Sequence, residues 1–102
     1  MTQQEALYIS IAQSLKDTVQ SQMFGKPCFK IGNKAFVCFF QNEMVFKLSG
    51  DIHTEALRLD GSQLFDPSGK KRPMKEWVQV SYDHKEKWTA YAVSALRHVS
   101  SS

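Results

Sequence analysis

The N-terminal segment repeats its apolar residues at helical spacing. Leu7, Ile11, Leu15 and Val19 are four residues apart, and mostly Gln, Ser, Lys and Asp side chains occupy the opposite side. This pattern predicts an amphipathic helix over residues 3–22 that packs its apolar row against a core.

The ends of this predicted helix carry their own signals. Thr2 followed by Glu5 has the spacing of a capping box, in which side chains satisfy free N–H groups of the first turn. Gly25 tolerates the left-handed conformation common after helices, and Pro27 cannot continue one. We therefore expect the helix to end before these two residues.

Three short apolar runs with the character of strands follow. They cover Cys28–Ile31, Lys34–Phe40 and Met44–Leu48. The first link, Gly32-Asn33, is a pair typical of tight hairpins, and the second, residues 41–43, is also short. Because parallel strands need a long crossover, these links predict an antiparallel meander.

The second of these strands is apolar on both sides. In a regular strand, Phe36, Cys38 and Phe40 share one face, and Val37 and Phe39 share the other. A sheet with one solvated face would alternate apolar and polar residues. We therefore expect the second face to be covered, either by another element or by a second copy of the chain. The candidate dimer face contains Val37, Phe39 and Val45.

The rest of the chain continues with short elements. A short helix capped by Asp51 is predicted over Ile52–Leu59, then strands over Gln63–Phe65 and Lys75–Ser81. Asp66-Pro67-Ser68-Gly69 has the residues of a tight turn, with Asp first, Pro second and Gly fourth.

The last predicted helix runs from about His84 to His98. Asp83 with Glu86 gives it a capping box, and apolar residues from Trp88 onward repeat every three or four positions. The serine tail at residues 100–102 is expected to fray. Helices segregated from an antiparallel sheet of about five strands define the α+β class, with residues 1–102 as one domain.

Composition and charge exclude few classes of function. The chain has 102 residues, of which 42% are hydrophobic, which argues against disorder. The formal net charge is +3, less than the excess typical of dedicated nucleic-acid binders. The candidate site for an anionic partner is the basic loop and the strand after it: Lys70, Lys71, Arg72 and Lys75.

Cys28 and Cys38 lie in two of the predicted strands. A two-residue loop at Gly32-Asn33 puts them on opposite faces, whereas a shift of one residue puts them side by side. We favour buried, reduced thiols that act as small hydrophobes; the alternative is a redox pair.

The N-terminus gives no sign of export. Residues 1–5 lack a basic region followed by an apolar core, and the longest apolar run, Ala35–Phe40, is too short to cross a bilayer. We therefore expect a cytoplasmic protein without membrane contact. The three histidines lack metal-ligand spacing, so we predict no metal site, no cofactor and no catalytic residue.

Several motifs together resemble a known family. They are Met23-Phe24-Gly25, Lys26-Pro27-Cys28-Phe29, Gly32-Asn33-Lys34-Ala35-Phe36, Met44-Val45-Phe46-Lys47-Leu48 and the stretch from Leu64 to Val78 that includes Pro73-Met74-Lys75-Glu76-Trp77. Over roughly residues 5–99 the chain is similar to the N-terminal domain of TfoX/Sxy proteins, in a compact stand-alone branch. The resemblance implies an α+β domain with a central antiparallel sheet. The two-domain members regulate competence genes together with other transcription proteins, and the resemblance covers only their N-terminal domain, so a regulatory role is not implied directly.

Three functional hypotheses remain. The leading one is a non-enzymatic binding or regulatory module that acts through protein contacts, as a homodimer. The second is a nucleic-acid-associated transcription regulator that uses the basic loop. The third is a small-ligand binder or enzyme, which would need a pocket with perturbed titratable groups.

Overall fold

The computed structural model describes residues 1–101, so Ser102 of the predicted frayed tail lies outside the described residues. The elements are α1 (Gln3–Gln13), β1 (Thr18–Met23), β2 (Lys26–Ile31), β3 (Lys34–Phe40), β4 (Glu43–Lys47), α2 (Gly50–Arg58), β5 (Gln63–Phe65), β6 (Met74–Val80), the 3-10 helix η1 (Tyr82–Lys87) and α3 (Trp88–Ser100). The strands form one antiparallel sheet in the order β1-β2-β3-β4-β6-β5. The predicted α+β class is confirmed, with six strands instead of about five.

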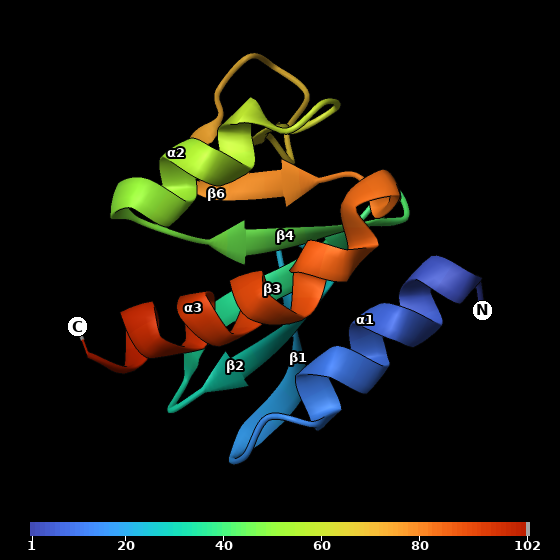
Figure 1. Ribbon diagram of the computed structural model, residues 1–102. Helices are drawn as coiled ribbons and strands as arrows, with labels where there is room; N and C mark the ends of the chain where they lie inside the picture. Colours follow the sequence, from blue (N-terminus) through green and yellow to red (C-terminus); the bar gives the residue numbers. More distant parts are fainter. Residues whose placement is uncertain (102) are drawn as a thin grey trace.

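Helices α1 and α3 lie across one face of this sheet, and α2 lies beside β6 at its top in Figure 1. Three two-residue hairpin loops join β1 to β4, and both residues of each loop have positive φ angles, between 53° and 73°. Such loops match the right-handed twist of the strands. The predicted meander is therefore confirmed, and it begins one strand earlier than expected.

The helix predicted over residues 3–22 is too long. α1 ends at Gln13, Asp17 reverses the chain with a φ of 66°, and Thr18 Oγ1 donates to two carbonyls at the end of the helical segment. β1 follows at the edge of the sheet, where Val19 is 64% exposed. The position of Val19 continues the helical row, but pairing with β2 outweighs that local preference.

The predicted caps have different outcomes. Thr2 caps α1, because its Oγ1 accepts a 3.0 Å hydrogen bond from the N–H of Glu5, as expected. The expected cap of α2 is wrong. Ser49 occupies the N-cap position, and Asp51 lies within the first turn.

The C-terminal helix begins later than predicted. Residues Tyr82–Lys87 form η1, which is capped by Ser81, whose Oγ accepts from the N–H of Asp83 at 3.1 Å. The predicted capping box of Asp83 and Glu86 is therefore wrong. The predicted apolar stripe of α3 is largely confirmed, and its buried members are Trp88, Tyr91, Ala92, Ala95 and Val99.

A β-bulge changes the faces of β3. Residues 29–30 of β2 oppose residues 35–37 of β3, so Phe36 is an extra residue in the ladder. Phe36 belongs to the core beneath the helices, whereas Cys38 and Phe40 pack on the other face. The prediction that these three share a face is wrong, because the strand is not regular.

The chain covers both faces of its own sheet. The second core contains Cys28, Cys38, Val45, Phe65 and Trp77, with Met23, Ala35, Phe40 and Met74 packed against it. The candidate dimer residues do not lie on the surface. Val37 and Val45 are fully buried and Phe39 is 8% exposed, and Val45 lies in the opposite core from the other two.

The interior predicts loss of stability in alkaline solution. Burial raises the pKa of Tyr8, Cys38 and Cys28 above their ordinary values of 10.0 and 9.0, and it raises the pKa of Tyr91, whose hydroxyl also donates to Glu55 at 2.6 Å. In alkaline solution these groups keep their protons in the native state but release them in the unfolded chain. The free energy of unfolding is therefore unaffected below the ordinary pKa values and falls as the pH rises above them.

Urea unfolding at about pH 7.5 and about pH 10.5 should show this loss of stability. Tyr8→Phe is the matched variant, because the buried Tyr8 hydroxyl has no hydrogen-bond partner within residues 1–101. It should be at least as stable as the wild type near neutral pH and lose less on raising the pH. Equal stability of the wild type at both pH values would contradict the assignment.

Candidate partner-binding surface

The basic loop predicted from the sequence is exposed. Lys70, Lys71 and Arg72 lie in the connection between β5 and β6, and Lys75 is exposed on β6. The carbonyl of Lys75 lies 2.7 Å from Nε2 of His53, so its backbone helps to anchor α2.

The carboxylate of Asp66 organises this loop from within. Its Oδ1 accepts from the Oγ of Ser68 at 2.7 Å and from the N–H groups of Ser68 and Gly69 at 3.1 Å, and its Oδ2 accepts from the N–H of Arg72 at 3.1 Å. The hydrogen bond from the Ser68 side chain, followed by those from the backbone, lowers the pKa of Asp66. The predicted turn is confirmed, since the N–H of Gly69 also lies 3.4 Å from the carbonyl of Asp66.

Removing this carboxylate should loosen the loop. Asp66→Ala leaves the N–H groups of residues 68, 69 and 72 without their acceptor, so limited trypsin digestion should cleave after Lys70 and Lys71 several times faster than in the wild type. Asp60→Ala, at an exposed position outside the loop, is the control. Equal cleavage rates of Asp66→Ala and wild type would show that the carboxylate does not hold the loop.

Phe24 is the most unusual residue of the surface. It is the first residue of the loop between β1 and β2, with a φ of 53°, and its side chain is 64% exposed. A bulky residue in the left-handed region is an outlier, because its Cβ crowds the backbone there. Asn and Gly are the residues that favour this position. Local stability therefore does not explain why an exposed aromatic residue stands here.

Phe24 lies beside the basic loop in space. Together with Pro67, Ser68, Arg72 and Met74 it lines a largely apolar hollow of about 310 Å³. We call these five residues, with Lys70 and Lys71, the Phe24–Arg72 surface. Met74 also packs against the second core, so the floor of the hollow is continuous with the interior.

Four further lysines, Lys26, Lys30, Lys34 and Lys47, lie at different places relative to this surface. Lys26 lies next to the β1–β2 loop, with its Nζ 5.2 Å from the centre of the Phe40 ring. Lys47 forms an ion pair with Glu76 at 3.7 Å. Lys30 and Lys34 flank the loop at the opposite end of β2. Of these lysines, Lys26 alone adjoins the surface through the β1–β2 loop.

Cys28 and Cys38 are cross-strand neighbours in the second core. The bulge supplies the one-residue shift that places them side by side, and both thiols are free and fully buried. Burial raises the pKa of both thiols, which disfavours the reactive thiolate at neutral pH. These properties are those of buried hydrophobes, the favoured interpretation.

The histidines make structural contacts. Nε2 of His84 lies 2.9 Å from the carbonyl of Asp60, and Nδ1 of His98 lies 3.3 Å from the Oγ of Ser49. Among the residues that the structure describes, no cluster of three or more His, Cys, Asp or Glu could hold a metal ion. Nor does any helix within residues 1–101 have the length and apolar character to cross a membrane.

The aromatic part of this surface was missed by the sequence analysis. The segment Met23-Phe24-Gly25 was interpreted as following the end of a helix, and the hollow that Phe24 shares with Arg72 joins positions far apart in the chain. Gly25, between a polar run and an apolar run, was the available signal of a turn. Comparisons of the chain with protein-family models, with curated proteins and with solved structures gave no match.

Proposed function

We propose that the chain is a non-enzymatic binding module that acts through protein contacts made by the Phe24–Arg72 surface. The observation that carries the proposal is Phe24, an exposed aromatic residue in a backbone conformation that disfavours it, beside an apolar hollow. Backbone strain persists at binding sites when function requires the residue. Aromatic and Arg side chains are also the residues that contribute most to protein interfaces.

The chemistry of the surface favours an acidic segment with one large apolar side chain. The hollow of about 310 Å³ has room for a large apolar side chain beside Phe24, Pro67 and Met74. Lys70, Lys71 and Arg72 supply three positive charges on the adjoining loop, and cations at the rim of an interface select a partner of opposite charge. The chain resembles TfoX/Sxy regulators, which work with other transcription proteins. This resemblance supports a transcription protein as the partner.

Selection from a random displayed-peptide library tests the proposal. Peptides enriched on the wild-type chain should carry Asp or Glu around one aromatic or aliphatic residue. Their binding should weaken at least about tenfold with Arg72→Glu and persist with Arg97→Glu, an exposed Arg on α3. Enrichment of basic peptides, or binding that ignores Arg72→Glu, would reject this surface.

A nucleic-acid-associated regulator is the second candidate. This candidate is favoured because Phe24 places an aromatic ring beside the cationic loop in space. Along the sequence, no aromatic residue interrupts the basic run at residues 70–72. It predicts binding to duplex DNA that weakens steeply with salt and with Lys70→Ala, Lys71→Ala and Arg72→Ala combined. Fluorescence anisotropy at low and moderate salt measures both effects. No binding at low salt would remove this candidate.

A further inference from the structure

The two edges of the sheet differ in how they are protected. β5 is a three-residue edge strand, and short edges offer little to a neighbour. β1 has six residues, Thr-Val-Gln-Ser-Gln-Met, with no charge, no Pro and no bulge against β2. Natural edge strands use charged residues, Pro and bulges to prevent pairing, and β1 has none of these three. Val19, 64% exposed, adds an apolar side chain to this open edge.

The register of the β1–β2 hairpin shows which backbone groups face outward. Gln22 is opposite Pro27, which has no N–H, so this pair is not a hydrogen-bonded one. Antiparallel pairs alternate between bonded and non-bonded, so Gln20 and Thr18 are also non-bonded with β2. Their N–H and C=O groups therefore point away from the sheet. No strand pairs with this edge of β1 among residues 1–101.

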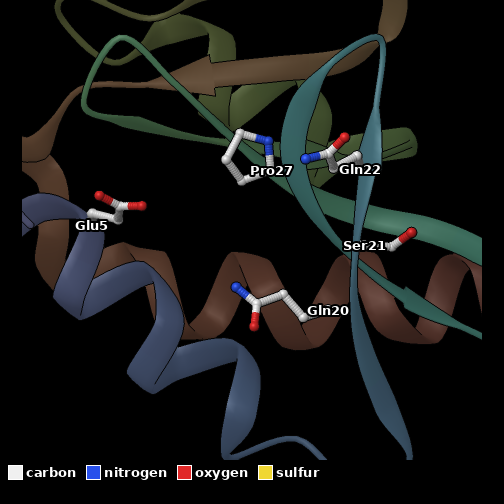
Figure 2. A pocket seen from close by; sticks show the side chains of 5 residues that line it. All are labelled: Glu5, Gln20, Ser21, Gln22 and Pro27. Carbon is white, nitrogen blue, oxygen red and sulfur yellow. The ribbon is translucent and has the colours of Figure 1, made fainter.

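Space is available beside this edge. Figure 2 shows Gln20 and Gln22 on the side of β1 nearer Glu5 of α1, and Ser21 pointing to the other side. The hollow between α1 and β1 has a volume of about 610 Å³. Pro27 of β2 also lines this hollow, so it lies over the helix-side face of the β1–β2 hairpin, and side chains of an added strand on that side would border it.

We propose that β1 pairs with the β1 of a second copy of the chain, antiparallel about a two-fold axis at Ser21. In this register Gln20 of each copy forms a hydrogen-bonded pair with Gln22 of the other, giving about four backbone hydrogen bonds. The exposed Val19 then lies opposite Met23 of the second copy, on the same face. No charged residues oppose each other along the strand, which is what a self-complementary interface requires.

This dimer adjoins the Phe24–Arg72 surface at one residue, since its register puts Phe24 opposite Thr18 of the second copy, but its hydrogen bonds come from Gln20 and Gln22. It joins two six-stranded sheets edge to edge and leaves Lys70, Lys71 and Arg72 outside the interface. It also supplies a homodimer without the buried residues Val37, Phe39 and Val45. The failure of one proposal therefore leaves the other intact.

Sedimentation analysis over an about hundredfold range of concentration tests the association. The wild type should shift from monomer to dimer as the concentration rises. Val19→Lys, which removes the apolar contact and charges the edge, should remain monomeric, while Gln13→Lys on α1 should dimerise like the wild type. A wild type that stays monomeric, or a dimer that Val19→Lys leaves unchanged, would overturn the proposal.

Cysteine cross-linking tests the register directly. Ser21→Cys places the new thiol opposite its own copy across the axis, in a pair close enough for a disulfide, so mild oxidation should give a covalent dimer. Val19→Cys is the control, because four residues of strand, about 13 Å, separate it from its copy. Both variants also carry Cys28→Ala, because Cys28 lies directly opposite Ser21 in the β1–β2 ladder and would compete for the new thiol, whereas Cys38 is buried on β3. Cross-linking of Val19→Cys as readily as Ser21→Cys would overturn the register.

Discussion

Phe24→Asn should unfold at a higher urea concentration than the wild type and bind its acidic partner at least about tenfold more weakly. Asn accepts positive φ more readily than an aromatic residue, and Asn-Gly is the preferred pair for a two-residue hairpin loop. Relieving the conformation of a residue at φ 53° should stabilise the native state by about 1 kcal/mol. The same change removes the aromatic wall of the hollow, and with it the anchor for an apolar side chain.

The opposite signs of these two effects make the variant informative. Phe24→Tyr keeps an aromatic ring in the strained position and should retain both wild-type stability and most of the affinity. A fall in stability for Phe24→Asn would show that the ring is there for packing. Unchanged affinity would show that the ring is not a contact residue.

Phe46→Ala should lose about 3–5 kcal/mol of unfolding free energy, a large part of the about 5–15 kcal/mol typical of a domain. Phe46 is fully buried on β4, in the middle of the sheet. Its ring centre is 5.6 Å from that of Tyr91 at an angle of 79°, so it connects the sheet with α3. Truncation removes this edge-to-face contact and leaves a cavity that neighbouring strands cannot close.

Urea unfolding followed by circular dichroism measures this loss of stability. Gln13→Ala is the control, because Gln13 is exposed on α1 and the change should alter stability by less than about 0.5 kcal/mol. A loss below about 1 kcal/mol for Phe46→Ala would show that the core beneath α3 is less tightly packed than the structure indicates.

The local patterns of the chain predicted most of its elements. The bounds of β3 and β5 agree with the predicted runs, because apolar stretches bounded by turn residues define strands well. The residues of β1 were predicted to be part of a helix, and this error has a physical reason. An edge strand with a polar sequence has little alternation, and Val19 falls on the helical row by spacing alone. Pairing with β2, a tertiary effect, decided the conformation.

The bulge and the candidate surface depend on contacts that spacing cannot encode. The sequence does not show that Phe36 is an extra residue in the ladder. The faces of β3, and whether Cys28 and Cys38 are neighbours, therefore could not be predicted. The sequence identified the charges at Lys70, Lys71 and Arg72. It did not identify their aromatic neighbour, because that residue is more than forty positions away.

Chemical-shift mapping by NMR tests the Phe24–Arg72 surface most directly. The wild-type chain, labelled with nitrogen-15, is titrated with an acidic peptide that carries a central Phe, and separately with a basic peptide of the same length. We expect the acidic peptide to shift the amide signals of residues 23–25 and 66–74, and Phe24→Asn to abolish these shifts. Shifts confined to α1 and α3, or equal shifts with the basic peptide, would contradict this expectation.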